Sequence, residues 1–194
     1  ASLAKEVGDR IPVRLVKGAY WDSEIKWSQV NGLEGYPVYT RKANTDVSYL
    51  ACAHYLMSPA TKGAIYPQFA THNAQTVVAI RDINQKYQRN IEFQRLHGMG
   101  DDLYDALLEQ DPNVTVRIYA PVGAHKDLLP YLVRRLLENG ANSSFVHKLV
   151  DPETPIVELT EHPVKTVLKH DNFANHKIPL PTEIFTDRKN SLGL

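Results

Sequence analysis

The sequence predicts an α/β fold whose parallel sheet is built from repeated strand–helix units. Four segments are rich in β-branched and aromatic residues, as strands are, and a segment with helical periodicity follows each of them. This alternation is typical of a parallel sheet with right-handed crossovers. The four expected strands span residues 13–21, 64–72, 91–98 and 114–121.

Polar residues in the middle of these strands help to choose between two architectures with the same alternation. The central strands of an open, doubly wound sheet are covered on both faces and should be almost wholly apolar. A barrel can use polar residues near its mouth for ligand chemistry. We therefore favour the C-terminal half, strands five to eight and the last helix, of a (β/α)₈ TIM-type barrel. Four units cannot close a barrel, so we expect four more to precede residue 1. The polar residues are Arg14, Lys17, Gln68, Gln94, Arg95 and Arg117.

The expected helices have recognisable starts and stops. The first residues look like the end of a helix with Gly8 as its cap, and Asn44 or Thr45 could cap the helix that runs to Met57. Pro130 suits the first position of a later helix, and Gly140 suits the position just after its end. The helices expected after the strands span residues 23–30, 46–57, 74–87, 101–109 and 131–140.

The composition changes from Asp151 onward, where five prolines punctuate the remainder of the chain. One helical stretch is expected at 163–170, and the last 20 or so residues look like an extended linker. We therefore divide the chain into residues 1–150, the C-terminal half of a barrel, and residues 151–194, a post-barrel helix and linker.

Charge and cysteine content argue against several classes of protein. Lys and Arg total 22, and Asp and Glu also total 22, so no overall field favours nucleic acid or an anionic membrane. The single cysteine, Cys52, excludes an internal disulfide and is typical of a reducing compartment, so we expect a cytoplasmic location. No apolar run approaches the roughly 18 residues of a membrane span. No metal-ligand spacing is evident, and we expect no metal site.

The helix at 131–140 combines an apolar face with a polar, cationic one. Its leucines and valine fall on one face, which predicts that this face packs on a core. Two arginines on the opposite face could grip a carboxylate through paired, charge-assisted hydrogen bonds. The alternative is a solvated face with one weak pair between Arg135 and Glu138. The apolar face consists of Leu132, Val133, Leu136 and Leu137, and the opposite face of Tyr131, Arg134, Arg135 and Glu138.

Three further segments could contact a ligand. Thr40, Arg41 and Lys42 stand just before a helix N-terminus, which is either a phosphate site or an ordinary capped helix with exposed bases. Gly18 would let the backbone approach a ligand closely, and the aromatic pair that follows could stack on a planar ring or pack in a core. The segment HGMGDD resembles a dinucleotide fingerprint, but Leu103 replaces the third glycine, so this signal is weak.

Several motifs occur in a fixed order along the chain: RLVKGAYW, VYTRKANTDVSYLACA, FATHN, QRLHGMG, RIYAPVG, YLVRRLLENGANSSFV and HKIPLPTEIF. Together they resemble the flavin-dependent proline dehydrogenases, and most closely the proline dehydrogenase domain of the bifunctional bacterial enzyme proline utilisation A. The resemblance implies a distorted (β/α)₈ barrel with FAD at the C-terminal ends of its strands. It also implies oxidation of L-proline to Δ1-pyrroline-5-carboxylate by hydride transfer to FAD.

The resemblance assigns roles to individual residues. Two arginines would bind the proline carboxylate, three apolar or aromatic residues would enclose the ring, and Arg14 would lie near the reactive flavin nitrogen, where positive charge stabilises the reduced, anionic flavin. The catalytic set is Arg134, Arg135, Tyr119, Tyr20, Leu96 and Arg14. The cofactor-binding set is Arg14, Val16, Gly18, Ala19, Trp21, Thr40, Arg41, Lys42, Thr45, Thr71, His72, Asn73, Gln94 and Glu138.

The resemblance also implies partners. These are L-proline, the N-terminal half of the same barrel, a membrane quinone as electron acceptor, and an accompanying pyrroline-5-carboxylate dehydrogenase. The Lys, Asp and Gln that the family draws from the first half of its barrel have no counterpart here. Two other functions stay open: a non-catalytic module that binds carboxylate or phosphate ligands, and a nicotinamide-dependent dehydrogenase that uses HGMG.

Overall fold

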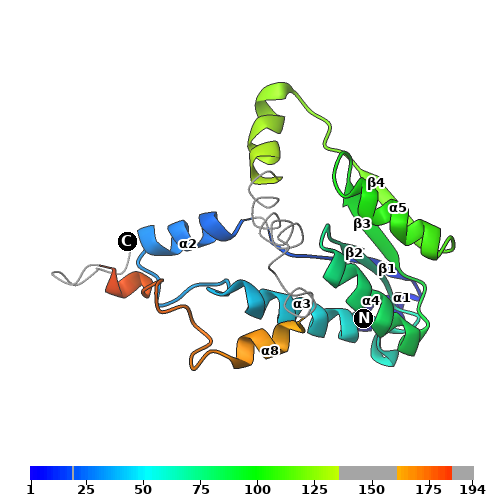
Figure 1. The fold of residues 1–194 in the computed structure, drawn as a ribbon, viewed down its shortest axis with the longest axis horizontal. Coiled ribbons are helices and arrows are strands. Elements are labelled where there is room, and N and C mark those ends of the chain that lie inside the picture. Colours follow the sequence, from blue (N-terminus) through cyan, green and yellow to red (C-terminus); the bar gives the residue numbers. More distant parts are fainter. Residues whose placement is uncertain (19, 136–160, 185–194) are drawn as a thin grey trace, which may run out of the picture. The chain divides into compact units, whose positions relative to one another are not determined.

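The computed structural model describes residues 1–18, 20–135 and 161–184, and it contains a four-stranded parallel sheet (Figure 1). The strands lie in the sheet in chain order, β1-β2-β3-β4. The four predicted strands are therefore present, and the prediction of an α/β fold with a parallel sheet is confirmed. The strands are β1 (Ile11–Val16), β2 (Ile65–Ala70), β3 (Glu92–Leu96) and β4 (Thr115–Tyr119).

Helices follow the strands as the periodicity predicts. The helix before β1 ends at Gly8, whose positive φ of 72° suits a glycine, as expected. The helices are α1 (Ser2–Val7), α2 (Trp21–Val30), α3 (Lys42–Met57), α4 (Ala74–Tyr87), α5 (Asp101–Gln110), residues 125–135 and α8 (Pro163–Leu168). Two short 3₁₀ turns lie at η1 (Pro59–Thr61) and η2 (Pro181–Glu183).

Three predicted helix starts are wrong. The first strand ends at Val16, and Trp21, which we placed in that strand, begins α2. The helix α3 already begins at Lys42, so Asn44 and Thr45 both lie inside it and neither caps it. The side-chain amide of Asn44 instead donates to the carbonyl oxygen of Phe173, at 2.8 Å.

The helix that contains the arginine pair also starts at a residue other than the predicted one. Helical structure begins at residue 125, so Pro130 lies within the helix and not at its first position. The carbonyl of Ala124 accepts the amides of Asp127 and Leu128, which starts the helix one and a half turns before the proline.

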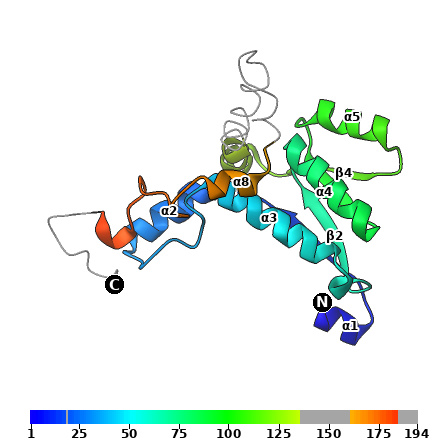
Figure 2. The ribbon, with the colours of Figure 1, turned by 60° about the horizontal axis from the view of Figure 1, so that its bottom comes forward.

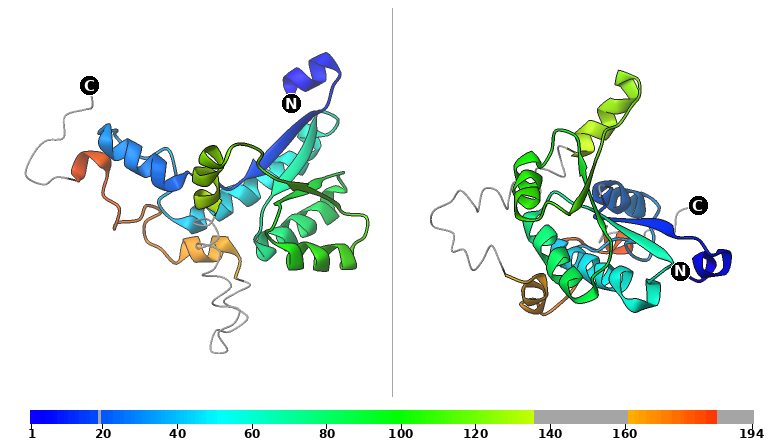
Figure 3. Two further views of the ribbon diagram at one scale, coloured as in Figure 1. Left: turned by 90° about the horizontal axis from the view of Figure 1, so that it is seen from above. Right: turned by 90° about the vertical axis from the view of Figure 1, so that its right-hand side faces the viewer.

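One face of the sheet packs against helices. Leu15, Phe69, Phe93 and Val116 pair in register from strand to strand, so their side chains form one row across the sheet. This row packs with buried residues of α3, α4 and α5, which lie on the same side of the sheet (Figure 3). The helical members of this core are Tyr49, Ala53, Met57, Val77, Ile80, Tyr104 and Leu107.

The chain forms two compact units. The first contains residues 1–17 and 48–132, and therefore the sheet and its core; the second contains residues 18–47 and 133–194. Within the second unit, the segment from α8 to η2, drawn in orange and red, runs beside α2 and the loop after it (Figure 2). The hydroxyl of Tyr36 donates to the carbonyl of Pro179, at 2.7 Å. The predicted domain boundary at residue 150 lies outside the described residues and stays a prediction.

Candidate functional site

The face of the sheet opposite the helices carries polar side chains. Side chains alternate along a strand, so residues between those of the core row point to the other face. Arg14 pairs in register with Gln68, and Gln68 pairs with Glu92. Two residues after Glu92 in β3, Gln94 pairs with Arg117 of β4. Four of the six polar residues on which the barrel prediction rested therefore share one face.

The other two polar residues point toward the helices. The ammonium group of Lys17 donates to the hydroxyl of Thr76 at 3.0 Å and lies over the ring of Tyr49. The guanidinium of Arg95 forms an ion pair with Asp101, at 2.7 Å, at the start of α5. These two cations therefore join strand ends to helices rather than line the polar face.

A buried carboxylate, Glu92, lies at the centre of the polar face. It is completely buried, and Arg117 donates to both of its oxygens, from Nε at 2.8 Å and from Nη2 at 2.7 Å. The side-chain amides of Gln94 and Gln68 donate to Oε1, at 2.7 and 3.1 Å. The hydrogen bonds from Arg117, above all, hold the pKa of the Glu92 carboxyl below its ordinary value, although burial acts in the opposite direction. The group is therefore ionised at neutral pH.

Glu92 is absent from the predicted site. A usable signal was present, since Glu92 stands two residues before Gln94 and must share its face in a strand. A carboxylate in a strand predicted to be buried needs a partner, and Arg117 of the next strand is that partner.

Four predicted site residues meet on the polar face. The Nε of Arg14 donates to Oε1 of Gln94 at 2.8 Å. The guanidinium carbon of Arg14 lies 4.9 Å from the centre of the Tyr119 ring, a cation–π contact. Tyr119 pairs in register with Leu96, which is buried. A cation, an aromatic ring and an apolar side chain thus lie together near the carboxyl ends of the strands.

The predicted residues Thr71, His72 and Asn73 follow β2. The carbonyl of Thr71 accepts the hydroxyl of Tyr104 at 2.8 Å, and Nε2 of His72 accepts the amide of Leu96 at 3.0 Å. The side chain of Asn73 accepts the amide of Thr76 at 2.9 Å and caps α4. These contacts hold the loop after β2 to the neighbouring strand and to α4 and α5.

The backbone conformation of the HGMG turn explains why glycines stand in it. Gly98 and Gly100 have positive φ, 77° and 69°, which a glycine adopts at no steric cost. A Cβ added at Gly100 would lie 3.3 Å from Cδ2 of His72, which leaves little room for a side chain. The turn into α5 thus accounts for both glycines without a dinucleotide.

In the second unit, Arg134 lies on Tyr20. The guanidinium carbon is 5.0 Å from the centre of the tyrosine ring. The Nε of Arg134 is buried and has no hydrogen-bond partner among the described residues, and a buried donor of this kind calls for an acceptor. Leu132 and Val133 are each 45% exposed, so the prediction that they pack on a core is wrong for these two, whereas Leu136 and Leu137 lie outside the described residues.

The candidate phosphate residues contact the segment that follows α8. The hydroxyl of Thr40 accepts the amide of Asn175 at 2.8 Å, and Nε of Arg41 donates to the carbonyl of Ala174 at 3.2 Å. Lys42 forms an ion pair with Asp46 at 2.8 Å, one helical turn away. Nearby, the indole N–H of Trp21 donates to the carbonyl of Tyr39, at 2.8 Å.

The predicted site residues divide between the two units, and each unit brings its own share together. Ala19 and Glu138 lie outside the described residues, and so does the expected pair between Arg135 and Glu138. The first unit holds Arg14, Val16, Thr71, His72, Asn73, Gln94, Leu96 and Tyr119. The second holds Gly18, Tyr20, Trp21, Thr40, Arg41, Lys42, Thr45, Arg134 and Arg135.

The donor set suits an anionic ligand. The second unit offers a buried, unsatisfied guanidinium donor, further cations and hydroxyls, while an added Cβ at Gly18 would meet no atom within 4 Å, which leaves space for a ligand. Among the described residues, no cluster of three His, Cys, Asp or Glu side chains could hold a metal ion. No helix in the described part of the chain is long and apolar enough to cross a membrane.

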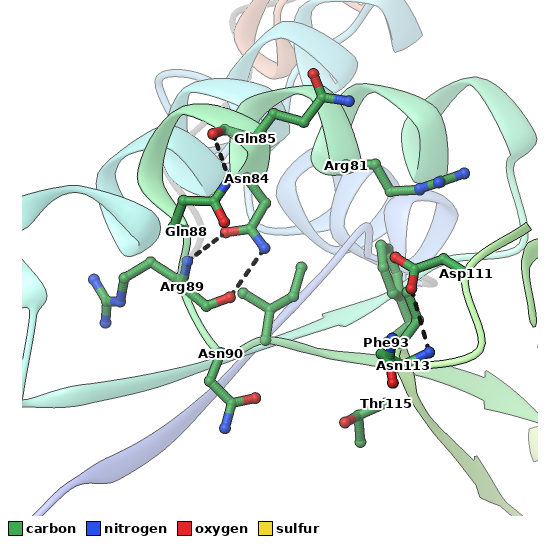
Figure 4. A pocket seen from close by; sticks show the side chains of 12 residues that line it. Arg81, Asn84, Gln85, Gln88, Arg89, Asn90, Phe93, Asp111, Asn113 and Thr115 are labelled. Atoms are coloured by element: carbon green, nitrogen blue, oxygen red, sulfur yellow. Dashed lines mark hydrogen bonds between the residues drawn. The ribbon is translucent and has the colours of Figure 1, made fainter.

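A separate hollow opens at the other end of the sheet (Figure 4). Its lining is rich in amide side chains, several of which already bind neighbouring backbone: Asn84 donates to the carbonyl of Arg89 and accepts its amide, both at 2.9 Å. It includes Ile91 and Val114, which precede β3 and β4, so it lies at the amino ends of the strands. None of the predicted site residues lines it.

The sequence of the chain is similar to those of proline dehydrogenases. A family model described as proline dehydrogenase matches residues 1–148. The bifunctional protein PutA of Klebsiella aerogenes is 52% identical over 205 residues, which cover 99% of this chain and 16% of that protein. Proline dehydrogenase 2 of Arabidopsis thaliana mitochondria is 36% identical over 135 residues, 66% of this chain and 28% of that protein. The chain therefore spans about one sixth of the length of its bacterial relatives.

Solved structures agree with the sequence matches. A proline utilisation A variant from Bradyrhizobium japonicum superposes with a TM-score of 0.86 at 50% identity, over 99% of this chain and 20% of that chain. Proline utilisation A from Bdellovibrio bacteriovorus, inactivated by N-propargylglycine, gives a TM-score of 0.74 at 36% identity, over 85% of this chain and 17% of that chain.

Proposed function

Because this chain belongs to the proline dehydrogenase family, we propose that it forms the substrate- and flavin-binding part of an enzyme that oxidises L-proline to Δ1-pyrroline-5-carboxylate. FAD, when bound, supplies the acceptor for the hydrogen removed from the ring carbon beside nitrogen. The observation that carries the proposal is the cluster of Arg14, Gln94, Tyr119 and Leu96 near the carboxyl ends of parallel strands. That end of the strands is where enzymes with (β/α)₈ folds perform chemistry.

We assign the grip on substrate to the arginine pair. Proline carries a carboxylate, and Arg134 and Arg135 offer guanidinium forks that match it. The buried, unsatisfied Nε of Arg134 supports this assignment, because a ligand carboxylate would satisfy it. Tyr20 holds the Arg134 guanidinium against its ring, and such stacking limits the orientations that the fork can adopt.

We assign the apolar walls around the pyrrolidine ring to Leu96, Tyr119 and Tyr20. Their flat or branched surfaces exclude water from the reacting carbon and hold the ring in one orientation. Arg14 places a positive charge beside Tyr119, and this charge would stabilise a reduced, anionic flavin bound next to it. No side chain of the cluster is a strong base, and none is required if proline binds with its amine neutral.

Two groups of residues would hold the cofactor. Thr40, Arg41, Lys42 and Thr45 are suited to the pyrophosphate, since cations and hydroxyls lie there at the N-terminus of α3. Asp46 would compete with the pyrophosphate for Lys42, so we expect Arg41 to contribute more than Lys42 to pyrophosphate binding. The residues assigned to the flavin and adenine ends are Arg14, Val16, Gly18, Ala19, Trp21, Thr71, His72, Asn73, Gln94 and Glu138.

We propose that the sheet is half of a (β/α)₈ barrel and that a further segment supplies the other half. The sequential strand order, the helices on a single face and the polar opposite face all favour a barrel over a doubly wound sheet. Among the described residues, β1 and β4 each pair with only one strand, and such edges need covering. We further propose a quinone at the membrane surface as electron acceptor, carried over from the family, and a cytoplasmic location, which the single cysteine favours.

Product formation tests the proposed function. The full-length enzyme should convert L-proline into an imine that an amine-bearing aromatic aldehyde traps as a coloured adduct, with an artificial dye as electron acceptor. Absence of the adduct, with a folded, flavin-loaded enzyme, would contradict the proposal.

A further inference from the structure

We propose that Glu92 is a positioning residue for the redox site, since it fixes the side-chain amide of Gln94 and, through it, the guanidinium of Arg14. The inference rests on the proposed function, in which Arg14 stands beside the flavin. It adds a residue that neither the sequence patterns nor the family resemblance marked.

The contacts form a chain of three side chains. The Gln94 amide donates through Nε2 to Oε1 of Glu92 at 2.7 Å, and it accepts through Oε1 from Nε of Arg14 at 2.8 Å. An ionised carboxylate only accepts hydrogen bonds, and a guanidinium only donates them. The amide between them therefore has one favourable orientation, which Glu92 dictates.

Glu92 itself cannot turn away. Its carboxylate is completely buried, and Arg117 holds both oxygens through two N–H groups. The amide of Gln68 and the hydroxyl of Tyr66 also approach it, at 3.1 and 3.4 Å. The groups that hold Glu92 lie on β2, β3 and β4, so the carboxylate has a fixed position relative to the sheet.

Arg14 needs such an anchor. Its side chain is long and flexible, and the stacking on Tyr119 restricts only the plane of the guanidinium. The hydrogen bond from Nε to Gln94 adds a direction within that plane. The two contacts together define where the positive charge lies on the polar face.

Exchange of Glu92 for glutamine isolates this role. A glutamine at this position has one acceptor and one donor head atom, so Arg117 meets a donor in either orientation, and Gln94 meets one when the new NH₂ group takes the place of Oε1. In that orientation Gln94 relieves the conflict by turning its amide, its NH₂ group then faces the Nε of Arg14, and two donors cannot bond. Arg14 then loses its anchor while the volume of the side chain at position 92 stays nearly unchanged.

The direction in which the midpoint potential of the flavin shifts distinguishes a displaced Arg14 from the mere loss of a negative charge. Removal of a negative charge leaves the Arg117 cation uncompensated, which alone would favour the reduced cofactor and raise its midpoint potential. Displacement of Arg14 acts in the opposite direction, because a stabilising positive charge moves away. The proposal therefore predicts a lower potential for Glu92→Gln, although a carboxylate has been removed.

The experiment is a redox titration of the full-length, flavin-loaded enzyme. Glu92→Gln should reduce the equilibrium constant of flavin reduction at least tenfold, a shift of about 30 mV to lower potential for a two-electron couple. Flavin content should stay close to wild type, so that the two potentials refer to equally loaded enzymes. The control is Tyr66→Phe, which removes another contact of the same carboxylate but none of Gln94 or Arg14, and it should leave the potential unchanged.

A raised or unchanged potential in Glu92→Gln would overturn the proposal, and so would an equal fall in Tyr66→Phe. A crystal structure of the variant gives a readout that needs no flavin: the hydrogen bond between Arg14 and Gln94 should be lost, and its retention would also overturn the proposal. Failure of the proposed function is separately visible, as a wild-type enzyme that binds no flavin or ignores proline.

Discussion

Replacement of Arg134 by methionine should weaken the use of proline strongly and specifically. Methionine keeps much of the apolar stem, and its sulfur can contact the Tyr20 ring, but it removes the guanidinium fork together with its cation–π contact. The Nε of Arg134 is buried, so its interaction with a carboxylate is screened little by solvent. Removal of one partner of a buried charge pair costs roughly 2–5 kcal/mol, which is a loss of roughly 30- to 4,000-fold in kcat/KM.

Steady-state kinetics of the full-length enzyme with two substrates gives the clearest assay. The loss should appear with proline and not with pyrrolidine, which has the same ring without the carboxylate. The matched control is Lys126→Met, which removes a cation from an exposed position of the same helix and should change neither substrate's kinetics. Equal losses for proline and pyrrolidine, or wild-type kinetics with proline, would refute the assignment of Arg134 to the carboxylate.

Three further predictions concern the cofactor and the fold. Arg41→Ala should weaken FAD retention in dialysis more than Lys42→Ala does, because Lys42 already forms an ion pair with Asp46. Equal losses of FAD from the two variants would contradict this ranking. Phe93→Ala should lower the free energy of unfolding by about 3–5 kcal/mol, because Phe93 is completely buried in the core row, and a melting temperature near wild type would contradict this. The lowered pKa of Glu92 implies stability that is fully present above its ordinary pKa of 4.5 and lost as pH falls through the folded-state pKa. The stability difference between wild type and Glu92→Gln in denaturant titrations should therefore shrink below pH 4.5 and stay constant from pH 6 to 7.

Elements whose signals are local could be predicted from the sequence. The helix predicted at 74–87 has these bounds in the structure, since Asn73 caps it through a neighbour three residues away. The four strands were predicted because β-branched and aromatic residues cluster in each. Elements whose starts depend on distant contacts were not predicted correctly: α3 begins earlier than expected, and its Asn44 binds Phe173, 129 residues further along the chain.

The candidate site shows the same division. Arg14, Gln94 and Tyr119 were named from motifs, and the structure brings them together. Glu92 was missed because its significance depends on strand register: its partner Arg117 is 25 residues away, and only the pairing of β3 with β4 places the two side by side. The two-residue spacing from Gln94 indicates the face on which the acid lies, but it does not identify the partner across the sheet.

Anaerobic reduction of the bound flavin by proline tests the central claim most directly. The full-length enzyme, purified yellow, should lose its flavin absorbance when L-proline is added without oxygen, and the absorbance should return with an electron acceptor. Arg134→Met should need far more proline for the same bleaching. An enzyme that carries no flavin, or whose flavin absorbance is unchanged at saturating proline, would contradict the account.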